Sequence, residues 1–268
     1  MFDRALRVLL PSLFAVAAVA AHAQERVFID ELTSPELQAL VRAGRTTALV
    51  PIGGTEQSGP HIVLGKHNVR VKALAEKIAA SLGDALVAPV IAYVPEGNVS
   101  PPSSHMRFAG TMTVPAATFE SVLEYAARSL RASGFRDIFF IGDHGGYQRS
   151  EEAVAQRLNR EWGGTQVRVH ALGEYYRVTE TRYRDALKAR GYTDREIGTH
   201  AGVADTSLAL AVDPGLVRTK ELASPAARDA AHGAYGDPRR ASAEAGAVGV
   251  DLIVRASVSA IRQAVARR

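Results

Sequence analysis

The stretch "TTALVPIGGTEQSGPHIVLGKHN", residues 46–68, joins a short apolar run to a long polar segment. "TTALVPI" has the length and composition of a buried strand, whereas the sixteen residues from Gly53 to Asn68 show neither helical nor alternating apolar periodicity. They contain a carboxylate, a serine, two histidines and four glycines. Because ligands in open α/β sheets bind beyond the carboxyl ends of strands, this stretch predicts an α/β fold with a site at the end of this strand.

The rest of the chain alternates short apolar runs with amphipathic stretches. Strands are predicted at 47–52, 85–93, 137–141 and 166–172, and helices at 69–82, 116–133, 151–162 and 243–266. This order predicts a largely parallel sheet with helices on both faces. Two segments rich in Pro, Gly and Ser, 95–115 and 223–242, are expected to be irregular surface loops of the kind that often border a site.

The N-terminal residues have the pattern of an export signal. Arg4 and Arg7 precede an apolar run at 8–20, which is followed by "AHA" at 21–23. The alternatives are a buried helix or a membrane anchor, but the run is short for a membrane span and ends in small residues. We therefore expect a cleaved signal peptide at 1–23, one domain at 24–268, and a periplasmic or secreted protein.

Composition narrows the classes of function. The chain is 47% hydrophobic and 22% charged, which is typical of a globular protein. It contains no cysteine, so neither a disulfide nor a thiolate metal site is expected. Removing Asp3, Arg4 and Arg7 lowers the formal charge from +4 to +3, which is too mild to indicate nucleic-acid binding. After cleavage no apolar stretch is long enough for stable membrane insertion.

A second polar cluster, "GDHGGY" at 142–147, follows the predicted strand at 137–141. Glycines around a histidine pack poorly but allow the backbone to approach an ion or substrate closely. Glu56, His67 and His144 are expected to converge at one sheet edge, and carboxylate and imidazole are ligands that Zn, Mn or Fe accept. Taken singly, His144 is explained equally well as a hydrogen-bonded loop histidine, and for His61 that explanation is favoured.

Four ordered motifs resemble the creatininase family of metal-dependent amidohydrolases. The family typically has "TEQHGPHLPLGTD" where residues 55–67 read "TEQSGPHIVLGKH", and an "NGHGGN"-like turn at 142–147. Its "H..F.GT" element matches His105, Phe108, Gly110 and Thr111, and "HAG..ETS" matches "HAGVADTS" at 200–207. The resemblance implies a three-layer α/β/α sandwich, homo-oligomers, and hydrolysis of C–N bonds in small cyclic or linear amides by metal-activated water.

The resemblance also implies a ligand set, from which this chain departs. The family ligands are the Glu and His of "EQH", the Asp of "GTD" and the His of the glycine-rich turn, and creatininase adds a Glu two residues later. Glu56 and His144 match, whereas Ser58, His67 and Gly146 replace the other three ligands. An imidazole cannot bridge two metals as a carboxylate can. We therefore expect a mononuclear centre held by Glu56, His67 and His144, with Zn preferred over Mn or Fe.

The expected mechanism is attack of a metal-activated water on an amide carbonyl. Asp205 or a loosely ligated Glu56 would accept the proton of the water, although Asp205 also suits the N-cap of a following helix. By resemblance His200 lies near the leaving nitrogen as a general acid. His61 or Asp143 would orient a metal-binding imidazole by contacting the side of the ring that faces away from the metal.

Three further residues are candidates for contact with a small-molecule amide. His105 and Arg107 suit a polar or anionic substrate group, or equally a solvated loop. Tyr147 stands where the family has Asn and is expected to reshape the pocket. Two other functions remain open: a ligand-binding protein that has lost catalysis, and an iron-dependent deformylase or peptide-trimming enzyme.

Overall fold

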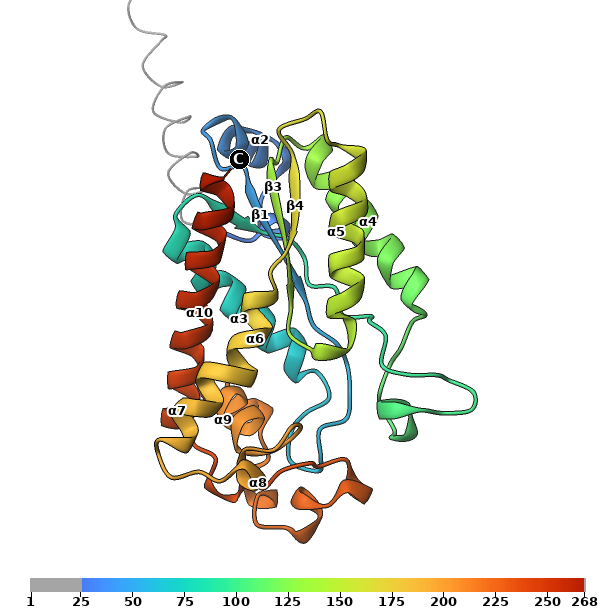
Figure 1. Cartoon of the computed structure of the whole chain (residues 1–268), viewed down its shortest axis with the longest axis vertical. Coiled ribbons are helices and arrows are strands. Elements are labelled where there is room, and N and C mark those ends of the chain that lie inside the picture. Colours follow the sequence, from blue (N-terminus) through green and yellow to red (C-terminus); the bar gives the residue numbers. More distant parts are fainter. Residues whose placement is uncertain (1–25, 268) are drawn as a thin grey trace, which may run out of the picture.

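A computed structural model describes residues 26–267, so the predicted signal peptide at 1–23 lies outside the described residues. Its centre is a four-stranded parallel sheet in the order β2-β1-β3-β4 (Figure 1). The strands are β1 (Thr47–Ile52), β2 (Ala85–Val87), β3 (Asp137–Gly142) and β4 (Arg168–Ala171). β1 and β3 run side by side over six residue pairs, from Thr47 opposite Asp137 to Ile52 opposite Gly142. Their carboxyl ends therefore meet at one edge.

Helices cover both faces of the sheet, as the alternating pattern predicts. α3 (Lys66–Leu82), α6 (Gly173–Val178) and α10 (Ala243–Ala266) pack on one face, and α4 (Ala116–Ala132) and α5 (Gln148–Glu161) on the other (Figure 1). The remaining helices are α2 (Ser34–Arg42), α7 (Arg184–Lys188), α8 (Asp194–Ile197) and α9 (Val203–Val212). The three-layer α/β/α sandwich is thus confirmed. Within residues 26–267, no helix has the length and apolar character of a membrane span.

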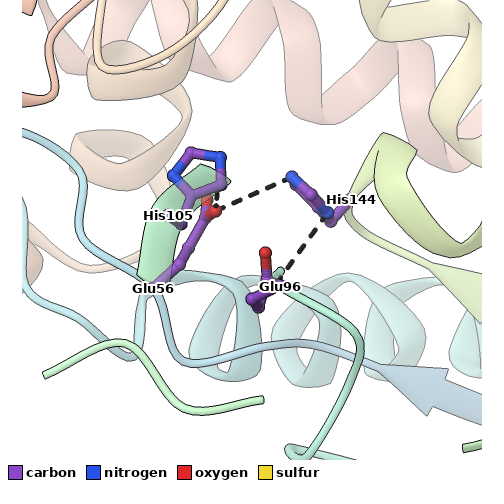
Figure 2. A group of neighbouring side chains, drawn as sticks. All are labelled: Glu56, Glu96, His105 and His144. Carbon is purple, nitrogen blue, oxygen red and sulfur yellow. Dashed lines mark ion pairs between the residues drawn. The ribbon is translucent and has the colours of Figure 1, made fainter. Parts of the chain in front are cut away.

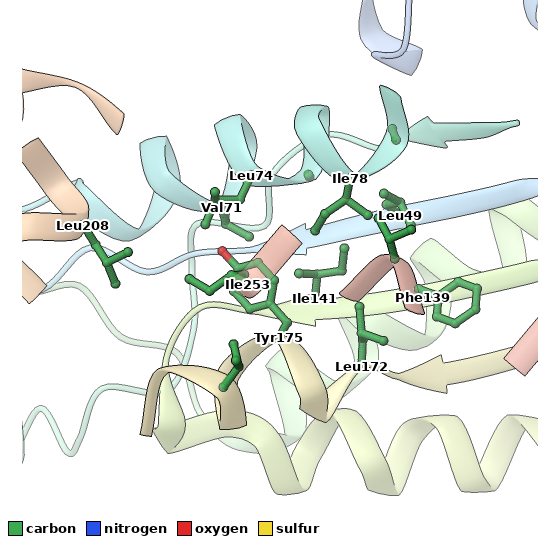
Figure 3. Close-up of a cluster of buried hydrophobic side chains, with 14 of the residues drawn as sticks. Leu49, Val71, Leu74, Ile78, Phe139, Ile141, Leu172, Tyr175, Leu208 and Ile253 are labelled. Atoms are coloured by element: carbon green, nitrogen blue, oxygen red, sulfur yellow. The ribbon is translucent and has the colours of Figure 1, made fainter. Parts of the chain in front are cut away.

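Strand alternation divides the core into two layers of apolar side chains. Leu49, Phe139 and Ile141 point toward α3, where they meet Val71 and Ile78 (Figure 3). Their neighbours along the same strands, such as Val50 and Phe140, belong to the cluster under α4 and α5. Because every residue of β1 and β3 is buried, these strands read as continuous apolar runs.

The predicted elements are present, with informative differences at their ends. The helix at 243–266 has the predicted bounds. The segment 95–115 is irregular as predicted, apart from one 3-10 turn at Ser104–Arg107, and it ends directly before α4. β2 ends at Val87 instead of residue 93, and beyond this point only an isolated bridge between Ile52 and Ile91 continues the pairing with the chain of β1. α3 begins at Lys66 instead of residue 69, which places Lys66, His67 and Arg70 together on its first turns.

A buried carboxyl group in α5 yields a test of this packing. The side chain of Glu151 is fully buried, and neither of its oxygens has a hydrogen-bond partner among the described residues. Burial raises the pKa of Glu151 well above its usual value of 4.5. The folded protein therefore binds a proton here that the unfolded chain releases, and its stability falls as pH rises above the unfolded pKa.

We expect Glu151→Gln to raise the free energy of unfolding at pH 7 by about 1–3 kcal/mol, because an amide avoids the cost of ionising a buried carboxyl group. The variant should also show a smaller loss of stability between about pH 5 and pH 8 than the parent protein. Urea unfolding at several pH values measures both effects. Glu152→Gln, at the exposed neighbouring position, is the matched control. A loss of stability at pH 7 in Glu151→Gln would contradict this prediction.

Candidate active site

The candidate site lies where the loops that follow β1 and β3 leave the sheet. Ile52 is paired with Gly142 at the ends of these strands, so the segments that carry Glu56 and His144 start next to each other. The irregular segment 95–115 and the turn before α9 complete the surroundings with His105 and His200. Residues far apart in the sequence therefore meet at the carboxyl edge of the sheet, as expected for this class of fold.

Glu56 is the central side chain of this site and is fully buried. Its Oε1 lies 2.7 Å from Nε2 of His67 and 3.5 Å from Nζ of Lys66. Its Oε2 lies 3.3 Å from Nε2 of His105 and 3.6 Å from Nε2 of His144, and has no hydrogen-bond partner within residues 26–267. The two oxygens of one carboxylate thus face two different surroundings.

Glu96 is a second buried carboxyl group beside Glu56. It is 3% exposed, and in the part of the chain that the structure describes neither of its oxygens has a hydrogen-bond partner. Oε1 lies 3.9 Å from Nδ1 of His144. Burial and the negative charge of Glu56 raise the pKa of Glu96 to about 8. Two neighbouring carboxylates in a buried place are costly to ionise together unless a cation lies between them.

One ligand atom from each of Glu56, Glu96, His105 and His144 can be chosen so that all four lie within 4.8 Å of one another. Figure 2 shows the side chains of Glu56 and Glu96 directed toward the two imidazole rings. Three carboxylate oxygens without hydrogen-bond partners and two imidazoles are donors that Zn, Mn or Fe accept. The residues present therefore fit a divalent metal ion.

His67 lies between two carboxylates instead of in this four-residue group. Nδ1 is 2.6 Å from Oδ2 of Asp143, and Nε2 is 2.7 Å from Oε1 of Glu56. Nη2 of Arg70 also lies 3.1 Å from Nδ1 of His67. Burial and the charge of Lys66 act to lower the pKa of His67, but Glu56 and Asp143 outweigh them and raise that pKa. Through its contacts with the two carboxylates, His67 positions Glu56.

Asp143 and Asp205 are both held by cations from α3. The guanidinium of Arg70 donates to Oδ2 of Asp143 at 2.9 Å and to Oδ1 of Asp205 at 2.7 Å. Tyr175 donates to Oδ1 of Asp143 at 2.7 Å, and Lys66 forms a close ion pair with Asp205. Burial opposes ionisation of Asp205, yet Lys66 and Arg70 hold its pKa well below the usual range.

Asp205 fits neither of the roles considered from the sequence, which were proton acceptor and helix N-cap. Besides Lys66 and Arg70, it accepts the backbone N–H of Ala201 at 3.1 Å. A carboxylate with three donors and a depressed pKa is a poor proton acceptor near neutral pH. The N-cap alternative is wrong, because Gly202 is the N-cap of α9 and Asp205 lies within the first turn of the helix.

His200 faces the same centre as a neutral ring. Its Nε2 lies 2.8 Å from the carbonyl oxygen of Gln57, which can only accept, so Nε2 carries the hydrogen. Nδ1 is turned to Glu56, 3.7 Å from Oε1. Burial lowers the pKa of His200 to about 3. At neutral pH His200 therefore offers a lone pair to the centre and has no extra proton to donate.

A cavity of ≈ 380 Å³ opens from these residues and provides room for a substrate. Its polar lining includes Lys66, His105, His144, His200 and Asp205, and its aromatic lining comprises Tyr175, Tyr176, Tyr183 and Tyr235. Tyr235 comes from the segment 223–242, which thereby contributes to the site. Four residues of this lining, Arg184, Gly198, Thr199 and Tyr235, also line a second cavity of ≈ 670 Å³.

Tyr147 is a structural brace and does not line the cavity. Its side chain is 1% exposed. The hydroxyl accepts the backbone N–H groups of Asp143 and His144, each at 3.1 Å, and donates to the carbonyl oxygen of Ile52 or Gly53. It thereby ties the end of β1 to the end of β3. Tyr147 therefore does not shape the pocket directly, as was expected, but affects it by fixing the position of His144.

Three other predicted residues lie away from the four-residue group. His61 is buried, and its Nε2 lies 3.1 Å from both the carbonyl oxygen of Ala201 and Oγ1 of Thr206, so it contacts the α9 region instead of a ligand imidazole. Arg107 is exposed, and its Nε donates to the carbonyl oxygen of Ser104. Ser58 is buried, and its hydroxyl has no partner among the described residues.

Glu96, Lys66 and Arg70 are the site residues that sequence reasoning missed. Glu96 could have been identified from the sequence, because it is a carboxylate between Pro95 and Gly97 just beyond the predicted strand at 85–93. Lys66 and Arg70 carried none, because charged residues near a helix end normally face solvent. Only the burial of this helix turn against Asp143 and Asp205 distinguishes them.

Comparison with known proteins agrees with the fold and identifies the family. Residues 30–261 match the sequence model of the creatininase family, described as creatinine amidohydrolase. A creatinine amidohydrolase of Pseudomonas putida is 28% identical over 256 residues, covering 88% of this chain and 96% of its own length. A mycofactocin precursor peptide peptidase of Mycolicibacterium smegmatis is 30% identical over 198 residues, covering 71% of this chain and 66% of its own length.

Solved structures show the same relationship. A crystal structure of creatinine amidohydrolase superposes with a TM-score of 0.74 at 27% identity, covering 89% of this chain and 98% of that one. A Mn creatininase and a mutant creatininase of the Zn-Zn type each give a TM-score of 0.72 at the same identity and coverage. Since the family match covers most of the chain and the folds agree, this chain belongs to the creatininase family of amidohydrolases.

Proposed function

We propose that this protein is a metal-dependent amidohydrolase that hydrolyses a C–N bond of a small cyclic or linear amide at a centre with a single metal ion. One observation carries the proposal: the unpartnered oxygens of Glu56 and Glu96 face the imidazoles of His105 and His144 in a buried place. The family match supports hydrolysis of an amide. Export through residues 1–23, with a periplasmic or secreted location, and assembly into homo-oligomers are part of the same proposal.

The ligand set we propose replaces His67 by two residues of the segment 95–115. Glu56, Glu96, His105 and His144 hold the ion, whereas His67 keeps Glu56 in place through its contacts to two carboxylates. When bound, a divalent ion supplies Lewis acidity, which polarises a carbonyl oxygen and lowers the pKa of water. Zinc remains our first choice, with manganese or iron as alternatives.

The other residues of the cavity bind and orient the reactants. Nδ1 of His200 accepts a hydrogen bond from the attacking water or from the substrate N–H, because its Nε2 hydrogen is already held by Gln57. Asp143 keeps His67 in position, so it acts behind the site as expected. Asp205 keeps Lys66 and Arg70 in place and does not take the proton.

A peptide-trimming enzyme is the second candidate, and one observation favours it. The inner cavity shares Arg184, Gly198, Thr199 and Tyr235 with the outer cavity of ≈ 670 Å³, so a substrate longer than a single small ring has room to extend. One relative is named a peptide peptidase. A substrate panel decides between the two candidates.

Metal analysis tests the centre. Protein purified without chelators is expected to hold about one divalent ion per chain, and Glu56→Gln and His144→Ala to hold almost none. Glu96→Gln removes one of the four proposed ligands and should weaken binding by at least about tenfold, which is the cost of losing even a residue that only supports a ligand. Glu76→Gln, at an exposed position of α3, is the control. Two ions per chain, or an unchanged metal affinity in Glu96→Gln, would argue against this centre. If His67→Ala loses the ion but Glu96→Gln keeps it, the ligand set expected from the sequence would be correct instead.

Hydrolysis tests the reaction. We expect turnover of at least one compound in a panel of lactams, hydantoins, N-formyl compounds and short peptides, with loss of turnover after chelation and recovery on adding Zn²⁺ or Mn²⁺. His200→Ala should lower kcat by roughly 10²-fold while the ion stays bound, because it removes a group that orients the reactants. Turnover of peptides alone favours the second candidate. Inactivity with every metal, combined with retained ligand binding, would instead identify a binding protein.

A further inference from the structure

We infer that the Lys66 ammonium group takes the place of a second metal ion and thereby restricts the centre to a single ion. This inference rests on the proposed metal centre and names the residue that sets its stoichiometry. It is carried by the position of Nζ, which lies between the carboxylates of Glu56 and Asp205 in the interior of the site.

The two oxygens of Glu56 separate the centre into two sides. On the Oε2 side lie His105 and His144, with an oxygen that has no hydrogen-bond partner. On the Oε1 side, Nζ of Lys66 lies 3.5 Å away and Nε2 of His67 lies 2.7 Å away. One side of Glu56 is thus open to a cation, while the other already has cationic groups built from the chain.

Lys66 is held in this place from several directions. Its side chain is 1% exposed, although lysine is rarely buried without a partner. Asp205 is its close ion-pair partner, and Arg70 fixes the other oxygen of Asp205 at 2.7 Å. Since Arg70 also pairs with Asp143, the carboxylates on the Oε1 side are neutralised by side chains of α3.

A divalent ion on the Oε1 side would meet two obstacles. It would lie within a few ångströms of the Lys66 ammonium, where like charges repel strongly in a poorly solvated interior. It would also compete with Lys66 for the same oxygens of Glu56 and Asp205. Neither obstacle exists on the Oε2 side, because the groups that face that oxygen are imidazoles and the carboxyl group of Glu96.

The sequence at this turn points in the same direction. Where the family motif reads "GTD", this chain reads Gly65, Lys66 and His67. A neutral threonine is thus replaced by a lysine, and an anionic aspartate by a histidine. Gly146 adds to the effect, because a Cβ at this position would lie 2.9 Å from Cε1 of His144, so a ligand side chain there would displace the ring.

A purely structural role is the competing explanation: Lys66 would only balance the charge of Asp205. The two explanations differ in what they predict for metal binding. A structural lysine affects stability when it is replaced, but it does not change how many ions the protein holds. Stoichiometry, measured by elemental analysis of folded protein, separates them without any activity assay.

The decisive experiment compares three variants that differ only at residue 66. Ser58→His with His67→Asp restores two family ligands while Lys66 is retained, and we expect about one Mn²⁺ per chain. Adding Lys66→Thr to this pair should raise the content to about two ions, because the ammonium is gone. Lys66→Arg in the same background keeps the charge and should stay at about one ion.

Single substitutions in the otherwise unchanged chain keep the test available if the combined variants do not fold. Lys66→Met removes the charge at similar size, and we expect it to bind Zn²⁺ at least about tenfold more tightly in chelator competition, because repulsion is relieved. Lys66→Arg should bind as the parent does. Circular dichroism confirms that each variant is folded.

Two results would overturn the inference while leaving the proposed function intact. One is two ions per chain with Lys66 still present, and the other is no gain in ions or affinity when Lys66 is neutralised. Absence of any bound ion in the parent protein would instead overturn the metal centre itself. Failure of the inference is therefore distinguishable from failure of the proposed function.

Discussion

The contact between Glu56 and His67 inside the protein is the interaction on which the site depends. A fully buried carboxylate is stable only with charged or hydrogen-bonding partners, and His67 supplies one at 2.7 Å. His67 in turn requires Asp143 on its other nitrogen, and Asp143 requires Arg70 and Tyr175. The position of one carboxylate is thus set by a chain of contacts that ends in the core beneath α3.

This chain of contacts explains why the site is electrically asymmetric. Lys66, His67 and Arg70 all lie in the first turns of α3, at a helix end where positive side chains are disfavoured by the helix dipole. Asp143 and Asp205 compensate them, so these charges are retained only because the carboxylates are present. The opposite side of Glu56 has two imidazoles and Glu96 but no fixed cation. An added cation is favoured there for that reason.

The sequence predicted the fold more completely than the site, and the reason is physical. The buried strand at Thr47–Ile52 and the helix at Ala243–Ala266 follow from local apolar patterns, which directly reflect burial. Glu56 and His144 follow from their place behind parallel strands. The contacts of His67 depend on Asp143, which is 76 residues away, so no local pattern reveals that both of its nitrogens are occupied.

Some residues were predicted to belong to the site only because their side chains are polar, and the structure gives them a different role. Tyr147 and His61 are polar groups in glycine-rich turns, yet their atoms satisfy backbone groups of the strand ends and of the segment before α9. Glu96 is the reverse case, a carboxyl group without any such partner. A buried polar atom that satisfies the backbone is explained by the fold, whereas one that remains unpartnered needs another explanation, such as a bound proton or a ligand. The unpartnered oxygens of Glu56 and Glu96 lie beside two imidazoles, so these two carboxyl groups define the reactive centre more sharply than any of the histidines does.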